Sequence, residues 1–177
     1  NNKRVLLGVG GSQGSEFLNN HDLEGIKKNV IPDIHLIWLV GKNNFSKYED
    51  YNNSSSIVLS FVENMPYLYG FADLVVSRSG AMTVSELLQF EKPAIFVPFK
   101  FAAENHQYYN AKVLEENFAS IIMQEKDITG ETLFKKINEI FTNEKIYSSM
   151  KKNIREMNKP NSLKIITDNI LEHLHAN

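Results

Sequence analysis

A glycine-rich segment, GVGGSQGSEF at residues 8–17, begins as the apolar run RVLLGV ends, and it is the first candidate site in the chain. Glycines leave backbone N–H groups free to face an anion, and a helix that starts just beyond a strand directs its unpaired amides at the same place. The dinucleotide pattern G-x-G-x-x-G does not fit, because Gln13 stands where the third glycine belongs. A tight strand-to-helix turn without a ligand would use the same glycines, with Ser12 as the helix N-cap.

A second loop of this kind is SRSGAMTVSE at residues 77–86, which follows the apolar run ADLVV. The first amides of a helix that starts near Gly80 have no partner within the helix, and the helix dipole adds partial positive charge there. Such a terminus stabilises an anion by about 0.3–1 kcal/mol when exposed and by about 2 kcal/mol when partly buried. Thr83 and Glu86 also have the spacing of a capping box, so a cap and a ligand contact compete for the Glu86 carboxylate.

A third polar loop follows Pro98, where Glu104, Asn105, His106 and Gln107 crowd the start of the next helix. Mixed hydrogen-bond donors and acceptors suit a hydroxyl-rich ligand such as a sugar. An ordinary polar helix terminus would have the same composition. Three polar or glycine-rich loops at corresponding strand ends favour a shared binding site.

The elements that must hold these loops alternate along the chain. Six short apolar runs, mostly continuous and β-branched, predict strands that are buried on both faces of a parallel sheet. They are residues 5–9, 35–40, 57–59, 74–77, 94–97 and 121–123. Segments of helical period lie between them, at residues 17–30, 67–72, 83–90 and 105–117. We therefore predict an α/β fold with a Rossmann-like, doubly wound parallel sheet of about six strands.

From Thr129 onward the pattern predicts only helices. The segment LKIITDNILEHL repeats apolar residues along one helical face, which predicts a last helix that packs on the core of the domain. The apolar positions of this face are Leu163, Ile166, Ile170, Leu171 and Leu174.

Composition narrows the class of protein. The 177 residues are 42% hydrophobic and 23% charged, which is typical of one globular domain. A net charge of −2 with scattered Lys and Arg argues against nucleic-acid binding. The absence of cysteine excludes disulfides and thiolate metal sites, and no apolar run has the length of a membrane span, so we expect a cytoplasmic protein. Because the chain begins without methionine just before a core strand, we expect a fragment of a longer protein.

Several motifs, in order, resemble the carboxyl-terminal half of the MurG-type glycosyltransferases of family 28. They are GGSQG, FVENM, ADLVVSRSGAMTVSEL, KPAIFVPF and ENHQYYNA, densest between residues 72 and 111. The resemblance implies a two-domain GT-B fold, in which residues 1–177 are the single domain that binds the donor nucleotide and the amino-terminal acceptor domain is missing. It implies an inverting transfer of N-acetylglucosamine (GlcNAc) from UDP-GlcNAc to lipid-linked muramoyl-pentapeptide, in bacterial cell-wall synthesis.

The same resemblance assigns roles by position. Ser12, between Gly11 and Gln13, would contact the diphosphate, and Val62 would hold the uracil through its backbone. Glu86 would accept the ribose hydroxyls, and Gln107 would bind the sugar beside His106, which departs from the glutamine expected there. The start of the second helix would face ribose and phosphates, and it comprises Gly80, Ala81, Met82, Thr83, Val84 and Ser85.

The chemistry requires stabilisation of the diphosphate charge that develops as the bond to the sugar breaks. The sequence has no Asp-x-Asp pair for a metal ion, and YEDY at residues 48–51 is predicted to be a solvated surface loop. We therefore expect amides and helix dipoles to act without a metal or other cofactor, with Arg78 and Lys100 as unassigned auxiliaries. No histidine has an orienting carboxylate at an obvious spacing, so the catalytic residues are expected in the missing half.

The expected partners are UDP-GlcNAc or UDP, the missing domain and, through the full-length enzyme, the lipid-linked acceptor. By the same resemblance the full-length enzyme would lie on the cytoplasmic face of the bacterial inner membrane, and the isolated chain would be inactive. Two alternatives remain open. The chain could be the small subunit of a two-protein GlcNAc transferase, or a module that binds a UDP-sugar without chemistry.

Overall fold

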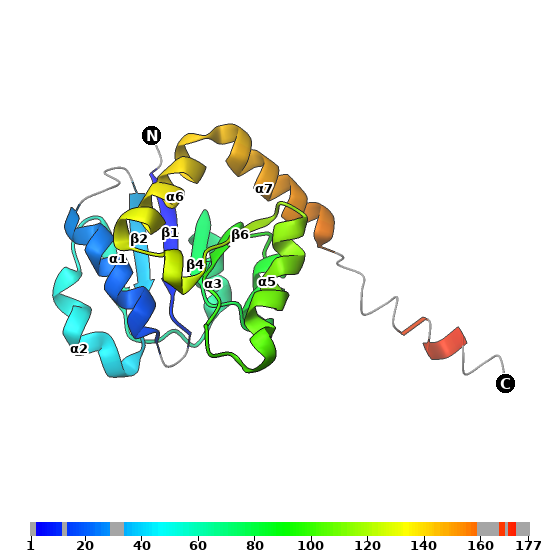
Figure 1. The fold of residues 1–177 in the computed structure, drawn as a ribbon, viewed down its shortest axis with the longest axis horizontal. Helices are drawn as coiled ribbons and strands as arrows, with labels where there is room; N and C mark the ends of the chain where they lie inside the picture. The colour runs from blue at the N-terminus through cyan, green and yellow to red at the C-terminus, as the bar shows by residue number, and fades with distance from the viewer. Residues whose placement is uncertain (1–2, 12–13, 29–33, 159–166, 169, 173–177) are drawn as a thin grey trace.

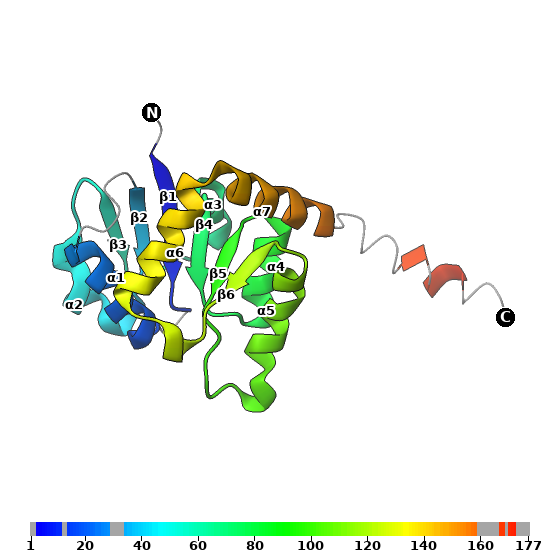
Figure 2. The ribbon, with the colours of Figure 1, turned by 45° about the horizontal axis from the view of Figure 1, so that its top comes forward.

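Six parallel strands form one sheet in the order β3-β2-β1-β4-β5-β6 (Figures 1 and 2). The computed structural model describes residues 3–11, 14–28, 34–158, 167–168 and 170–172. The strands are β1 (Arg4–Val9), β2 (Ile34–Leu39), β3 (Ser56–Leu59), β4 (Leu74–Ser77), β5 (Ala94–Phe96) and β6 (Ser120–Ile122). The predicted doubly wound sheet is confirmed, and each strand begins and ends within one residue of its predicted run.

The strands bury side chains on both faces of the sheet. Leu6 and Trp38 belong to one buried cluster, whereas Leu7 and Leu39 belong to the other. Successive side chains of a strand point to opposite faces, so a continuous apolar run can pack against helices on both sides. This is the physical reason why β1, β4 and β5 are continuous in hydrophobicity, whereas burial alternates along the edge strand β3.

The helices are divided between the two faces. The cluster with Trp38 receives residues from α1 (Glu16–Lys28), α2 (Phe45–Tyr48) and α6 (Gly130–Thr142). The cluster with Leu7 receives residues from α3 (Met65–Phe71), α4 (Ala81–Gln89) and α5 (His106–Glu116). Helix α7 (Glu144–Met157) crosses above the sheet at the top of Figure 1 and contributes Met150 to the first cluster and Ile154 to the second.

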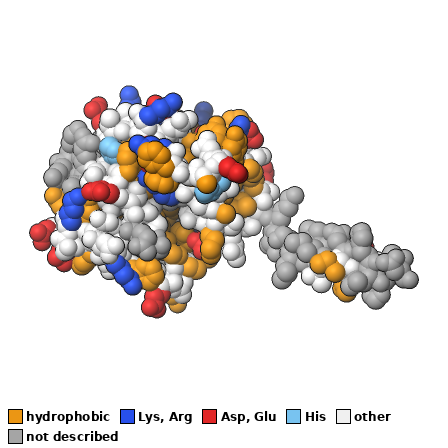
Figure 3. All heavy atoms as spheres, turned by 60° about the horizontal axis from the view of Figure 1, so that its bottom comes forward, with side chains coloured by type: hydrophobic (Ala, Val, Ile, Leu, Met, Phe, Trp, Pro, Cys, Tyr) orange, Lys and Arg blue, Asp and Glu red, His pale blue; other side chains and the backbone are white. Residues whose placement is uncertain are grey.

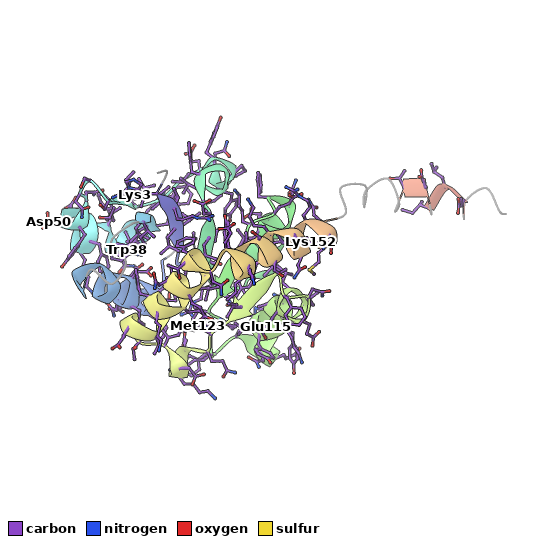
Figure 4. The ribbon with its side chains drawn as sticks, turned by 90° about the horizontal axis from the view of Figure 1, so that it is seen from above. Lys3, Trp38, Asp50, Glu115, Met123 and Lys152 are labelled. Atoms are coloured by element: carbon purple, nitrogen blue, oxygen red, sulfur yellow. The ribbon has the colours of Figure 1, made fainter. Side chains whose placement is uncertain are left out.

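Four short 3-10 helices, η1 (Lys42–Asn44), η2 (Glu49–Tyr51), η3 (Ala103–Asn105) and η4 (Glu125–Asp127), complete the described elements. The segment YEDY therefore lies at the end of α2 and in η2 rather than in a loop. Tyr48 is fully buried, because its ring packs beside that of Trp38 in the same hydrophobic cluster, with 4.8 Å between the ring centroids. Glu49 and Asp50 are exposed as predicted, and Figure 4 shows Asp50 at the outer margin of the fold, beyond Trp38.

The predicted last helix is only partly described. Ile170 and Leu171 are 55% and 46% exposed, so the predicted packing on the core is wrong at these two positions. Leu163, Ile166 and Leu174 lie outside the described residues. Among the described residues, no helix is long and apolar enough to cross a membrane.

Helix α1 approaches the sheet and α6 closely, at two glycines. A Cβ on Gly25 would overlap the ring of Phe134 in α6, and a Cβ on Gly8 in β1 would lie 3.0 Å from Oδ2 of Asp22. Asp22 is 2% exposed, and its Oδ1 has no hydrogen-bond partner among the described residues. Burial raises the pKa of the Asp22 carboxyl to about 7, so α1 carries a carboxylic acid in an apolar layer.

The order of the strands places the loops that follow β1 and β4 next to each other. The chain runs outward from β1 through β2 to β3, and then returns to add β4 on the other side of β1. Ligands of open α/β sheets bind at this reversal, outside the carboxyl ends of the strands. In Figure 1 these strand ends point downward, away from α7.

Candidate functional site

Three loops meet at the carboxyl ends of β1, β4 and β5 around a cavity of about 480 Å³. Figure 3 turns this end of the protein toward the viewer and shows hydrophobic and basic side chains next to each other on the surface. The lining residues come from the glycine loop, from the loop before α4, from the loop before α5 and from η4. They include Gly14, Ser15, Arg78, Phe99, Gln107 and Glu125.

The glycine loop is shaped largely by the backbone of the protein itself. Gly11 and Gly14 have φ values of +87° and +78°, which side chains of L-residues rarely adopt, and Gly14 N donates to Gly11 O at 2.9 Å. A Cβ on Gly10 would overlap Ser15 N, and one on Gly14 would overlap the carbonyl oxygen of Val40. The tight-turn interpretation therefore accounts for three of the glycines, independently of any ligand.

Ser15, and not Ser12, caps α1. Helix α1 starts at Glu16, and Ser15 Oγ accepts a hydrogen bond from Leu18 N at 3.3 Å. A cap three residues before its donor is the usual N-cap geometry, which corrects the alternative in which Ser12 had this role. Ser12 and Gln13, both predicted to bind the ligand, lie outside the described residues.

Arg78 joins the loops around the cavity. Its Nη2 lies 2.6 Å from Oε1 of Glu125 and donates to Ser15 Oγ at 3.0 Å, while Nη1 donates to Val97 O at 3.0 Å. Only 14% of the Arg78 side chain and 7% of the Glu125 side chain are exposed. Burial lowers the pKa of Arg78, and the adjacent Glu125 carboxylate opposes that shift, so the guanidinium remains charged. Arg78 thus ties the end of the glycine loop and η4 to the loops that follow β4 and β5.

The start of α4 is open. Gly80 is the N-cap residue, with φ −61° and ψ 148°, and no side-chain hydrogen bond from the described residues caps the helix. Its first amides therefore face the loop without a side-chain acceptor, which is the condition for binding an anion. Ala81 and Met82 are exposed, as is Ser85, and Val84 is buried in the cluster with Leu7. Val84 can therefore offer a ligand only its backbone.

The capping box predicted from Thr83 and Glu86 is not formed. Thr83 is the third residue of α4 and not its N-cap, because the helix begins two residues earlier, at Ala81. The Glu86 carboxylate instead accepts a hydrogen bond from the hydroxyl of Tyr69 in α3, at 2.8 Å. Of the two interpretations of Glu86, the structure excludes the cap and leaves the carboxylate available to a ligand.

Gln107 anchors the loop before α5. Its Oε1 accepts from Phe99 N at 3.0 Å, so the amide NH₂ is the group that remains to donate. His106 is exposed at the first position of α5, and its Nδ1 lies 2.8 Å from Ala103 O. Gln107 lines the cavity. His106 is not among the lining residues, and its ring contacts the backbone of the loop before α5.

Val62 lies in the segment between β3 and α3, where its partly buried side chain packs against the cluster with Leu7. The side chain of Val62 therefore packs in the core. This is compatible with the predicted role of Val62, because that role requires only its backbone. Lys100 is 60% exposed and its Nζ lies 4.0 Å from Glu125 Oε2. Within the described residues, no three His, Asp or Glu side chains come close enough to share a metal ion.

Sequence reasoning missed four residues that shape the site: Ser15, Tyr69, Asn110 and Glu125. Asn110 Nδ2 donates to Ser79 O at 3.1 Å and so ties α5 to the loop before α4. Ser15 could have been found as a second polar residue at the predicted helix start. No local signal identifies the other three, because their partners lie 17 to 47 positions away in the chain.

A second cavity, of about 500 Å³, lies against β2, β3 and α3 and includes Ile37, Ile57, Leu68 and Phe71. Its described lining contains no Lys or Arg, and none of the three loops reaches it. The polar residues of its lining are His35, Asn53 and the serines at residues 54–56.

Comparisons with known proteins give the family to which the chain belongs. The chain matches the Glycosyltransferase family 28 C-terminal domain over residues 5–166. It is 34% identical over 173 residues to a protein of Finegoldia magna and 39% identical over 171 residues to one of Sulfurihydrogenibium sp.. Both are named UDP-N-acetylglucosamine--N-acetylmuramyl-(pentapeptide) pyrophosphoryl-undecaprenol N-acetylglucosamine transferase.

These matches cover 96% and 97% of the chain but 47% of each relative, so the chain spans about half the length of the curated relatives it matches. The crystal structure of Acinetobacter baumannii MurG superposes with a TM-score of 0.81 at 28% identity, covering 97% of this chain and 50% of that one. The chain belongs to the glycosyltransferase family 28 C-terminal domain family.

Proposed function

We propose that the chain is the UDP-GlcNAc-binding half of an inverting, metal-independent glycosyltransferase that moves GlcNAc onto lipid-linked muramoyl-pentapeptide in peptidoglycan synthesis. The observation that carries the proposal is the juxtaposition of two helix starts, those of α1 and α4, behind the neighbouring strands β1 and β4. Both helices direct the positive ends of their dipoles at the carboxyl edge of the sheet, and the first amides of α4 have no side-chain acceptor, so a diphosphate would be stabilised there from two sides.

The proposed reaction is a displacement at the anomeric carbon. The acceptor hydroxyl attacks from the face opposite UDP, the bond between that carbon and the diphosphate oxygen breaks, and the negative charge moves onto the leaving UDP. Amides that are already oriented stabilise this charge without reorganisation. Arg78 is held by Glu125 and Ser15 beneath the cavity, so its contribution to the reaction is to fix the loops.

The residues take the following roles in the proposal. Ser12 and its neighbours Gly11 and Gln13 bind the diphosphate together with the amides of Ala81, Met82 and Thr83. The backbone of Val62 holds the uracil, Glu86 accepts the ribose hydroxyls, and the amide NH₂ of Gln107 donates to the sugar. Support comes from the open start of α4, from the free side of the Glu86 carboxylate and from the position of Gln107 at the cavity.

The acceptor site and the general base belong, in this proposal, to the part of the relatives that the chain does not match. The names of the relatives include an undecaprenol-linked acceptor, which fits an enzyme that works at the cytoplasmic face of a membrane. The chain alone would then bind the donor without transferring the sugar.

Calorimetry with UDP, UMP and UDP-GlcNAc tests the proposal on the isolated chain. We expect UDP and UDP-GlcNAc to bind more tightly than UMP, because the second phosphate reaches the helix starts, and we expect EDTA to leave the affinities unchanged. A chain that does not bind UDP at millimolar concentration, or that binds it only with a divalent cation, contradicts the proposal. Transfer of GlcNAc to the lipid acceptor by the chain alone would contradict the division of roles between the two halves.

A further inference from the structure

Tyr69 is a buried tyrosine whose hydroxyl is directed at a residue of the proposed donor site. Tyr69 belongs to α3 and is 1% exposed. The centroid of its ring lies 5.5 Å from the ring centroid of Phe90, the residue that follows α4. Its hydroxyl donates to Oε2 of Glu86 at 2.8 Å. The packing of α3 beside α4 therefore fixes the hydroxyl in one place.

This contact determines how the Glu86 carboxylate is used. The start of α4 does not need it, because Gly80 is the N-cap and no capping box forms. Among the described residues, Tyr69 is the only side chain that donates a hydrogen bond to Glu86, and no ion pair involves it. An ionised carboxylate has two oxygens that accept, so one is held by Tyr69 and the other remains for a further donor.

Tyr69 is a stable donor. Burial raises its pKa well above the usual value, and the hydrogen bond to Glu86 raises it further. The hydroxyl therefore keeps its proton at any pH at which the protein works. A neutral donor of this kind orients a carboxylate and leaves its negative charge in place. A Lys or Arg partner would orient the carboxylate and also neutralise its charge.

We propose that Tyr69 is a positioning residue of the donor site, which holds Glu86 so that its second carboxylate oxygen faces the ribose and selects nucleotides that carry ribose hydroxyls. The inference rests on the proposed function, because it takes UDP as the ligand and Glu86 as its ribose contact. A site that is built to hydrogen-bond a hydroxyl discriminates against an analogue that lacks it, because the buried acceptor is then left without a donor.

The test compares UDP with 2′,3′-dideoxyuridine 5′-diphosphate, which lacks both ribose hydroxyls, on the whole chain by calorimetry. Tyr69→Phe removes only the hydroxyl. We expect it to lower the affinity for UDP about tenfold, the scale of a hydrogen bond to a charged group, and to leave the affinity for the dideoxy nucleotide unchanged. The ratio of the two affinities therefore falls toward one.

Tyr147→Phe is the matched control. Tyr147 in α7 is also buried, with 4% exposed, and its hydroxyl donates to a carboxylate, Oδ1 of Asp73, at 3.1 Å. Burial raises its pKa to about 12, so it resembles Tyr69 in chemistry. Because Asp73 directly precedes β4, this contact lies at the opposite end of the sheet from the three loops, and we expect Tyr147→Phe to keep the wild-type ratio.

Retention of the wild-type ratio by Tyr69→Phe overturns the inference and leaves the proposed function standing. If the wild-type chain itself binds both nucleotides equally, the ribose role of Glu86 is wrong and the inference falls with it; if it binds neither, the proposed function falls as well. A second readout needs no variant. The ¹³Cζ resonance of Tyr69, which reports on its hydroxyl, should shift when UDP binds and not when the dideoxy nucleotide binds, and an equal response to both nucleotides would also overturn the inference.

Discussion

The guanidinium of Arg78 lies 2.6 Å from the carboxylate of Glu125, and the two side chains are 14% and 7% exposed. Removal of one partner leaves a buried charge without compensation, which costs about 3–5 kcal/mol. We therefore expect Glu125→Gln and Arg78→Met to lower the free energy of unfolding by about this amount, as measured by chemical denaturation.

Two controls separate this effect from a general cost of mutation. The double variant Arg78→Met with Glu125→Leu removes both charges, and we expect it to recover most of the lost stability. Glu156→Gln breaks the pair between Glu156 and Lys152, whose side chains are 64% and 74% exposed, respectively. We expect this variant to change the free energy of unfolding by less than about 0.5 kcal/mol. Equal losses for Glu125→Gln and Glu156→Gln would show that the buried pair has no special role.

Asp22 predicts a dependence of stability on pH. Burial raises the pKa of this carboxyl from 3.8 to about 7. Between these values the folded protein keeps a proton that the unfolded chain releases, so this group makes the free energy of unfolding fall as the pH rises from about 4 to 7 and then level off. The loss is at most about 4 kcal/mol. Denaturation curves recorded from pH 4 to pH 8 measure it.

The comparison that isolates Asp22 uses two neutral variants. Asp22→Asn cannot ionise, so we expect its free energy of unfolding to change less with pH than that of the wild type. Above pH 7 we expect the variant to be more stable than the wild type. Asp50→Asn changes an exposed carboxylate in η2 and should follow the wild-type curve. An Asp22→Asn protein with the wild-type pH dependence would mean that the carboxyl is ionised in the folded state.

Alanine substitutions of Gly14, before α1, and of Gly80, before α4, are expected to differ in their effect on stability. Gly14→Ala forces a side chain into φ +78° and against the carbonyl of Val40, which should cost about 1–3 kcal/mol of stability. At Gly80 the φ is −61° and an added Cβ meets no atom within 4 Å, so Gly80→Ala should keep its stability within about 0.5 kcal/mol.

UDP binding by Gly80→Ala then reports on the ligand alone. The new methyl group lies where the proposed diphosphate approaches the amides of α4, and displacement from this helix start loses about 1–2 kcal/mol, or about tenfold in affinity. Calorimetry measures this loss. Unchanged UDP affinity in a stable Gly80→Ala protein would place the diphosphate away from α4.

The sheet was predictable from sequence because most of its strands are continuous apolar runs, a pattern that is typical of strands buried on both faces of a parallel sheet. The site loops were predictable because glycines and polar residues follow the ends of those runs. The short helix α2 was not predictable: it is only four residues long, and its last residue, Tyr48, packs on Trp38, a contact that no local pattern encodes.

The side-chain network of the site was beyond local reasoning for the same reason. The spacing of Thr83 and Glu86 fits a cap, yet α4 starts at Ala81 and the carboxylate turns to Tyr69 on a different helix. Glu125 meets Arg78 only because β6 is placed beyond β5 in the sheet. The close approach of Ser15 and Val40 explains Gly10 and Gly14 without a ligand.

Titration of the isotope-labelled chain with UDP in the presence of EDTA, followed by the amide resonances of every residue, tests the central claim most directly. If the glycine loop and the start of α4 hold the diphosphate, the largest changes fall on Gly11, Ser12 and Gln13 and on Ala81, Met82 and Thr83, and a chelator does not affect them. Changes that gather instead at the apolar cavity of β2, β3 and α3, or that require a divalent cation, would contradict the account.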